Sequence, residues 1–206
     1  MIRNLCSLAV LALTLCLAPR SARAADGPGT EVVRGANDTI AALLKQKAAP
    51  GSAAEQKAAA KVTTSVRDFL DIGQLTQRAL VDHWAKLTPA QRTDFLDTLR
   101  ALIEDNYVKG LRANLEYQVA YLGEAPGDGG TIVVRTQITA RKKGRPIKIA
   151  VDYVLLADGG KLRCFDVKTD GVGLVDNYRA QFNKIIAKDG FDGLLNRMKK
   201  KRAAGG

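Results

Sequence analysis

The sequence contains few of the residues that build metal centres and covalent crosslinks. Among 206 residues there is one histidine and there are three cysteines, and two of these, Cys6 and Cys16, lie near the N-terminus. Zinc fingers, multi-histidine metal sites and disulfide scaffolds need more of these side chains at defined spacings. These classes of protein are therefore excluded.

The longest apolar run is too short for a membrane-spanning helix. Leu5–Ala18 is uncharged for 14 residues, whereas a span needs about 20. Arg3 precedes the run, Pro19 ends it, and Ala22-Arg23-Ala24 forms a small-x-small cleavage pattern. This pattern predicts a secretory signal peptide over 1–24, cleaved after Ala24; an uncleaved anchor is the alternative.

Cleavage would change both the charge and the thiol content of the chain. The formal net charge falls from +11 to +8, because three arginines and no acids are removed. Cys164 is then the only thiol, and we expect it to be buried, since it has no partner in an oxidising compartment.

Catalytic motifs are also missing. The sequence has no nucleophile elbow, P-loop, H-E-x-x-H or dinucleotide fingerprint in its proper context. His83 is interpreted as a solvated helix residue and Cys164 as a structural strand residue. Asp152 and Asp166, on adjacent predicted strands, leave open a general base in a cavity, with ion pairs to Arg135 or Arg163 as the alternative. We expect that the protein is not an enzyme.

The excess of positive charge has no accompanying platform of aromatic residues, so we expect no nucleic-acid partner. It favours attraction to anionic lipid headgroups, or is only a basic surface. The same two interpretations apply to Lys199–Arg202, which we predict to lie in a flexible basic tail over 199–206.

Hydrophobic periodicity divides the rest of the chain into a helical half and a sheet half. Apolar residues at helical spacing predict helices over 31–44, 53–66, about 75–84 and Pro89–Asn114, the last opened by a capping box at Thr88–Gln91. Alternation then predicts strands over 115–121, 132–138, 147–155 and 162–168, joined by glycine-rich turns, before a last helix that follows Gly173.

This order predicts a single α+β domain over 25–198. N-terminal helices pack on a twisted four-stranded antiparallel meander, and a C-terminal helix follows. By analogy, the order is typical of the NTF2 or cystatin class, whose curved sheet often encloses an apolar cavity.

One stretch near the end carries a family signature. Asp166-Val167, followed by the Gly171–Phe182 segment GVGLVDNYRAQF, resembles the signature of the MlaC family, the periplasmic phospholipid-binding proteins also called the toluene-tolerance family. The similarity covers about 69–198. Further matching elements are Phe69-x-Asp71, Leu80, Trp84, Leu87–Arg92 with Phe95, Tyr107, and Gly190-x-x-Gly193-Leu194. Leu162 replaces the usual Trp, and Gly173 the usual Ser.

The resemblance implies an NTF2-like fold with an apolar pocket between helices and sheet, no catalytic residues, no metal and no cofactor other than bound phospholipid as cargo. It implies a soluble periplasmic carrier between an outer-membrane lipoprotein–porin complex and an inner-membrane ABC transporter with an MCE-type subunit, which maintains the lipid asymmetry of the outer membrane. We expect a monomer that contacts membrane surfaces transiently. A carrier of hopanoids or other lipids, a small-molecule enzyme of the same fold, and a purely structural partner of a transporter are the alternatives.

The inward faces of the predicted elements supply candidates for the pocket wall, and the tyrosines among them suit a rim where the hydroxyl meets a headgroup. The candidates are Tyr107, Val134, Ile138, Val151, Tyr153, Leu155, Phe165, Val167, Val172, Leu174, Tyr178 and Phe182. Arg179 is the candidate for the lipid phosphate, with an ion pair to Asp176 or Asp166 as the alternative.

Overall fold

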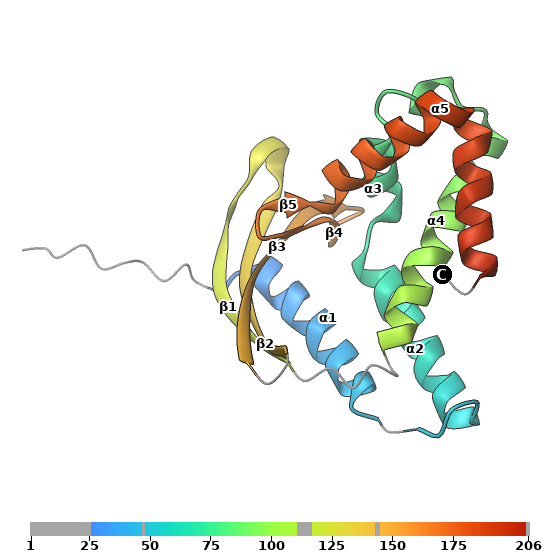
Figure 1. Cartoon of the computed structure of the whole chain (residues 1–206). Helices are drawn as coiled ribbons and strands as arrows, with labels where there is room; N and C mark the ends of the chain where they lie inside the picture. The colour runs from blue at the N-terminus through green and yellow to red at the C-terminus, as the bar shows by residue number, and fades with distance from the viewer. Residues whose placement is uncertain (1–25, 47, 111–116, 143–144, 205–206) are drawn as a thin grey trace, which may run out of the picture.

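The computed structural model describes residues 26–46, 48–110, 117–142 and 145–204. The predicted signal peptide, 1–24, and the end of the predicted fourth helix, 111–114, lie outside these ranges. The described chain is α+β, as predicted, with helices first, then an antiparallel sheet, then a long helix (Figure 1).

The first turns of these helices show how their free N–H groups are satisfied or avoided. In α1 (Pro28–Leu44), proline occupies the first turn, where no N–H partner is needed. In α2 (Ala53–Phe69), Ser52 accepts from Glu55 N at 3.2 Å. In α4 (Pro89–Gly110), Thr88 and Gln91 form the predicted reciprocal capping box, at 3.2 and 3.0 Å. The predicted starts of α2 and α4 are confirmed, whereas α1 begins three residues before the predicted position 31.

The third helix is shorter than predicted. α3 (Ile72–Ala79) begins where the Asp71 carboxylate accepts from Gln74 N at 2.9 Å, and ends at Ala79. Trp84 lies in a separate 3₁₀ turn, η1 (Trp84–Lys86). The prediction of one helix to Trp84 is wrong, because the apolar spacing continues across a turn that breaks the backbone pattern.

The sheet is a meander, as predicted, but the described residues form five strands rather than four. Its order is β1-β2-β3-β4-β5 and each described neighbour pair is antiparallel. The bounds are β1 (Tyr117–Pro126), β2 (Ile132–Lys142), β3 (Arg145–Asp158), β4 (Lys161–Thr169) and β5 (Val172–Gly173). A 3₁₀ turn, η2 (Asp128–Gly130), joins β1 to β2.

The helices cover one face of the curved sheet (Figure 1). α1 packs against β1 and β2, whereas α2, α3 and α5 (Leu174–Ala203) contact β4. Facing residues such as Val134 and Tyr153 are direct register partners, so they share this covered face. The core forms here, and includes Val33, Val62, Leu75, Leu80, Phe95, Leu99, Val134, Leu155 and Leu194.

The last helix is continuous past the point where we predicted a tail, since α5 runs to Ala203 and includes Lys199–Arg202. The prediction of a flexible segment from Lys199 onward is therefore corrected. The backbone breaks once within α5, at Gly190, where φ is 71° and ψ is 176°. The helix turns there, and its second half lies along α4 (Figure 1).

Candidate functional site

The side chain of Tyr107, on α4, lies near buried groups of the sheet and still reaches solvent. It exposes 37% of its surface, yet its pKa is raised strongly, first by burial and then by nearby Tyr153 and Cys164. A phenol that lies beside buried groups of the sheet and still reaches solvent is able to contact a bound ligand. The region around Tyr107 is the candidate site.

All five tyrosines of the chain take part in the electrostatics of this region. The Tyr107 phenol is close enough to Tyr117 and Tyr178, as well as to Tyr153, for each to raise its pKa. Tyr121 and Tyr117 in turn affect Tyr153, whose pKa burial raises to about 12. Phenols from α4, β1, β3 and α5 therefore converge, although they are far apart in the sequence.

Helix α1 meets this cluster through one amide. Asn37 donates to the Tyr121 hydroxyl at 3.2 Å, and the Tyr153 hydroxyl donates to Asn37 Oδ1 at 3.5 Å. The Arg34 guanidinium lies 4.0 Å from the centre of the Tyr121 ring. α1 is thus joined to β1 and β3 by polar contacts at the edge of the apolar face.

The predicted wall residues divide by their access to solvent. Val134 and Leu155 are fully buried, and Val151, Tyr153, Phe165 and Phe182 nearly so, whereas Ile138, Val167, Leu174 and Tyr178 are partly exposed. The structure brings Tyr107, Tyr153 and Tyr178 together. It places Val172 on the outer surface at β5, with 61% exposure, apart from the others.

Phe165 and Phe182 are held in packing that leaves less room for a ligand. Phe182 stacks on Tyr178 at 5.2 Å and meets Phe95 edge-on at 5.4 Å. The Arg78 guanidinium covers the Phe165 ring at 4.3 Å. These two side chains act as core between α5, α4 and α3.

Arg179 has its donors engaged by protein atoms. It donates from Nε and Nη2 to the Arg78 carbonyl, at 3.2 and 2.9 Å, near the end of α3. Its Nη1 lies 3.2 Å from the Asp176 carboxylate. These contacts correspond to the structural alternative that the sequence left open.

The other polar candidates also have structural partners. His83 contacts Asn183 at 2.9 Å, linking η1 to α5. Asp166 is buried and accepts from Val175 N at 3.0 Å, capping the start of α5. Asp152 lies between Arg135 and Lys168 on neighbouring strands.

Cys164 is fully buried, as expected; it donates to the Asp166 carbonyl at 3.2 Å, and burial raises the pKa of its thiol. Over the described ranges, no group of three or more His, Cys, Asp or Glu side chains is placed to hold a metal ion. No helix of those ranges is long and apolar enough to cross a bilayer.

Sequence reasoning missed Asn37, although a signal was present. Asn37 lies between Val33 and Ile40, at helical spacing, so it is a polar residue on the apolar stripe of α1. Such an interruption indicates either a polar network or a ligand contact. In the structure it is the link between Tyr121 and Tyr153.

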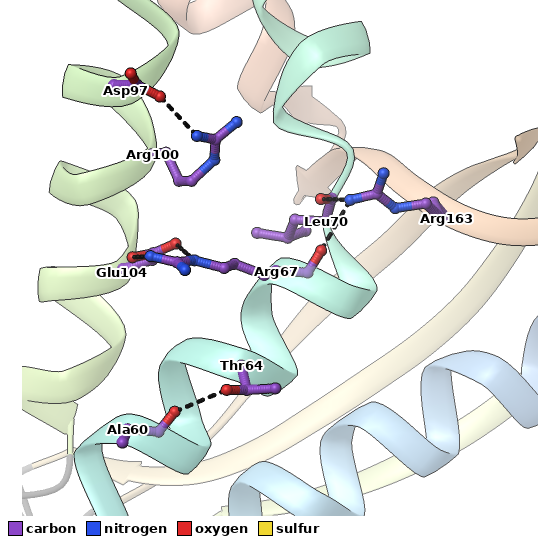
Figure 2. Close-up of polar contacts among 8 residues, drawn as sticks. All are labelled: Ala60, Thr64, Arg67, Leu70, Asp97, Arg100, Glu104 and Arg163. Atoms are coloured by element: carbon purple, nitrogen blue, oxygen red, sulfur yellow. Dashed lines mark hydrogen bonds and ion pairs between the residues drawn. The ribbon is translucent and has the colours of Figure 1, made fainter.

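A second group of missed residues lies at the far end of α2. Arg67, Arg100 and Arg163 border a cavity there with buried Glu104 (Figure 2). Glu104 falls within the apolar pattern of α4, and its burial could have been suspected from that position. The three arginines come from three elements, and no local pattern brings them together.

Two kinds of similarity to known proteins identify the family of this chain. A solved structure of the phospholipid-binding protein from Ralstonia solanacearum, in complex with a phospholipid, is similar to this one with a TM-score of 0.68. It is 26% identical in sequence, and the alignment covers 88% of this chain and 99% of that one. Among proteins with curated descriptions, none matches. The family model described as MlaC protein matches residues 34–200. Because that match spans most of the sequence, the chain belongs to the MlaC family.

Proposed function

We propose that this protein binds a phospholipid with its acyl chains in a recess beside Tyr107 and carries it through the periplasm. The observation that supports this most directly is the relative from Ralstonia solanacearum, which was solved with a phospholipid and shares the fold over nearly its whole length. Tyr107 keeps access to solvent, and its neighbour Tyr153 lies on the covered face of the sheet.

The proposed wall consists of apolar side chains on the half-covered part of the sheet, with tyrosines around them. Ile138, Ile149 and Val119 are cross-strand neighbours on the face that also carries Val134 and Tyr153, and each is only partly buried. Apolar residues that solvent reaches on an inward face are suitable contacts for acyl chains. Tyr107 and Tyr178 add hydroxyls that bond a glycerol or phosphate group.

The energetics of lipid transfer favour a carrier of this kind. Burying two acyl chains of about 16 carbons is favourable by about 25 kcal/mol, at about 0.8 kcal/mol per CH₂, and this free energy is lost when the chains enter water. A bilayer and an apolar recess offer comparable burial, so exchange between them is nearly balanced. Such a carrier makes and breaks no covalent bond, and it needs neither metal nor cofactor.

The donor and acceptor we propose are an outer-membrane lipoprotein–porin complex and an inner-membrane ABC transporter with an MCE-type subunit, so that the transfer maintains the lipid asymmetry of the outer membrane. Membership of the MlaC family supports this assignment. The protein acts as a periplasmic monomer after removal of residues 1–24.

The C-terminal end of α5 is the proposed point of transient contact with the membrane. Lys200, Lys201 and Arg202 are exposed in its last turns, while Lys199 pairs with Asp94 at 2.6 Å. Each cation of such a cluster contributes about 1 kcal/mol of binding free energy at an anionic bilayer, and salt weakens this attraction.

Native mass spectrometry tests the carrier function. The full-length chain is expressed, purified from the periplasm without detergent, and examined for bound lipid. We expect one or more diacyl phospholipids at near-stoichiometric amounts. Ile138→Trp, which adds bulk on the inward face, lowers the bound fraction severalfold, whereas Leu122→Trp, at a 52% exposed position of β1, leaves it unchanged.

A protein that stays empty after incubation with phospholipid vesicles contradicts the proposal. Equal lipid loading of both tryptophan variants contradicts the assigned location of the recess. Co-purification of a polycyclic lipid in place of phospholipid would identify a hopanoid-type carrier.

A further inference from the structure

A cavity of about 420 Å³ lies where the end of α2, the start of α3 and the middle of α4 meet. We call it the arginine pocket, after Arg67, Arg100 and Arg163, which border it. Figure 2 shows that these arginines come from α2, α4 and the sheet. Its apolar lining is made by Val66, Leu70, Ile72 and Ile103.

Arg67 neutralises the buried acid of the pocket. Its Nε and Nη2 lie 2.6 and 2.9 Å from the two carboxylate oxygens of Glu104, a bidentate pair. The Arg67 pKa is raised first by this hydrogen bonding and then by the charge of Glu104. With its charge balanced, Glu104 offers little repulsion to a further anion.

Arg163 is fixed at the border by the end of α2. Its Nη2 donates to the carbonyls of Arg67 and Leu70, at 2.8 and 2.7 Å. Its Nη1 is 3.6 Å from Asp158, and the side chain is 29% exposed. A guanidinium held in this way keeps its positive charge in one place at little further entropic cost.

Arg100 is the arginine available to a ligand. Its Nη1 contacts Asp97 at 2.8 Å, three residues earlier on α4, and Asp97 is largely exposed. Exposed ion pairs of this type contribute little to the stability of the folded protein. Its Nε and Nη2 have no partner in the described ranges, and the guanidinium points from α4 toward the Leu70 side of the cavity (Figure 2).

We propose that the arginine pocket receives a glutamate or aspartate side chain, next to an aliphatic residue, from a partner protein. The free fork of Arg100 matches a carboxylate in a bidentate arrangement. Arg163 adds a fixed positive charge, and Leu70 and Ile103 bury the aliphatic neighbour. One such anchor is a typical centre of a protein–protein contact.

The shape and charge of the pocket favour a protein over a membrane surface. Glu104 and Asp71 also line it, so its net charge suits one carboxylate rather than a dense layer of phosphates. Arg163 is recessed, and a flat headgroup layer does not enter a concavity. Leu70 and Ile103, which line the pocket, are themselves buried.

Docking of a partner at the arginine pocket is a function additional to the proposed lipid carriage, and a lipid carrier is a protein for which such docking is useful. The docking is tested by NMR titration of the ¹⁵N-labelled protein with acetyl-Leu-Glu-Leu-amide, and with the glutamine analogue as the matched probe. We expect shifts at the Arg100 side chain and at Leu70 and Ile103. The glutamine peptide binds at least tenfold more weakly.

Variants of the protein distinguish a loss of the Arg100 charge from a loss of folded structure. Arg100→Ala weakens binding of the glutamate peptide about tenfold, and Arg100→Lys restores only part of it, because lysine lacks the planar fork. Arg141→Ala, which removes an exposed arginine of β2, leaves the affinity unchanged. Circular dichroism confirms that each variant is folded.

Three results would overturn the inference: equal binding of both peptides, binding that is unaffected by Arg100→Ala, or no binding of either peptide. Binding of inorganic phosphate or of phosphatidylglycerol vesicles that requires Arg100, without peptide binding, would assign the pocket to phosphate groups instead. Native mass spectrometry of Arg100→Ala distinguishes the two proposals. Retained phospholipid with lost peptide binding supports both, whereas an empty wild type contradicts only the carrier function.

Discussion

The carboxylate of Asp166 accepts a hydrogen bond of 3.0 Å from the backbone N–H of Val175, in the first turn of α5. Its other oxygen faces Gly173, where an added Cβ would lie only 2.8 Å away. Asp166 on β4 thus caps the helix that follows β5. Gly173, one of the two departures from the family signature, lets the carboxylate approach this closely.

Replacing Asp166 should therefore destabilise the whole domain. We expect Asp166→Ala to lower the free energy of unfolding by about 1–2 kcal/mol, because the cap is lost in a buried setting. Asp176→Ala, at an exposed acid of the same first turn, should cost less than half as much. Urea denaturation followed by circular dichroism measures both, and equal effects would contradict the capping role.

The tyrosine cluster predicts a loss of stability in alkali. Burial raises the pKa of Tyr153 from 10 in the unfolded chain to about 12. Above pH 10 the unfolded state releases this proton first, so unfolding becomes easier as the pH rises to 12. The free energy of unfolding should fall by about 2 kcal/mol by pH 12 because of Tyr153 alone.

Urea denaturation between pH 8 and pH 12 measures this effect. Tyr153→Phe should flatten the pH dependence relative to the wild type, since phenylalanine has no proton to release. Absorbance near 295 nm should also show Tyr107 and Tyr153 ionising last in the folded protein. Ionisation of all five tyrosines together near pH 10 would contradict the enclosure of these phenols.

Cys164 should be unreactive while the protein is folded. The thiol is buried and its pKa is raised by burial, so almost no thiolate forms at pH 8. We expect no reaction with a disulfide reagent in buffer and complete reaction in guanidinium chloride.

The number of thiols in the denatured protein tests the predicted signal peptide at the same time. Protein from the periplasm should show one thiol per chain, because Cys6 and Cys16 precede Ala24. Three thiols would show that the N-terminal segment is retained. Rapid labelling of the folded protein would contradict the burial of Cys164.

Gly190 should resist substitution. Its backbone, with φ 71° and ψ 176°, lies in a region that only glycine adopts without strain. We expect Gly190→Ala to cost about 1–3 kcal/mol. Gly35→Ala, in α1 with open space around the position, should instead stabilise by about 0.5–1 kcal/mol. Thermal melts of both variants would test this, and a neutral Gly190→Ala would show that the bend is not required.

The sequence predicts those parts of the fold that depend on residues close together in the chain. Alternating residues such as Ile147, Ile149 and Val151 predict β3 and its covered face, and Thr88 with Gln91 predicts the start of α4. β5 was missed because two residues carry no periodicity. The end of α3 was missed because Leu80 and Trp84 keep a helical spacing across a turn.

The candidate site was less predictable, since it depends on contacts between distant segments. Sequence patterns identify Tyr107, Tyr153 and Tyr178 as inward residues, but they cannot show that the three phenols converge. Val172 was expected on the pocket wall yet lies at the surface, because β5 forms the edge of the sheet. Arg67, Arg100 and Arg163 are separated by more than 30 residues each, and only the folded chain reveals the pocket between them.

The bend at Gly190 determines where the end of the chain emerges. A straight helix of 30 residues would extend about 45 Å. Instead, the second half of α5 returns along α4, and Lys199 meets Asp94 there. In Figure 1 the C-terminal end lies beside α4, on the opposite side of the molecule from β1. An affinity tag or a sensor-chip linkage attached at this end would therefore leave the sheet side of the protein facing the solution.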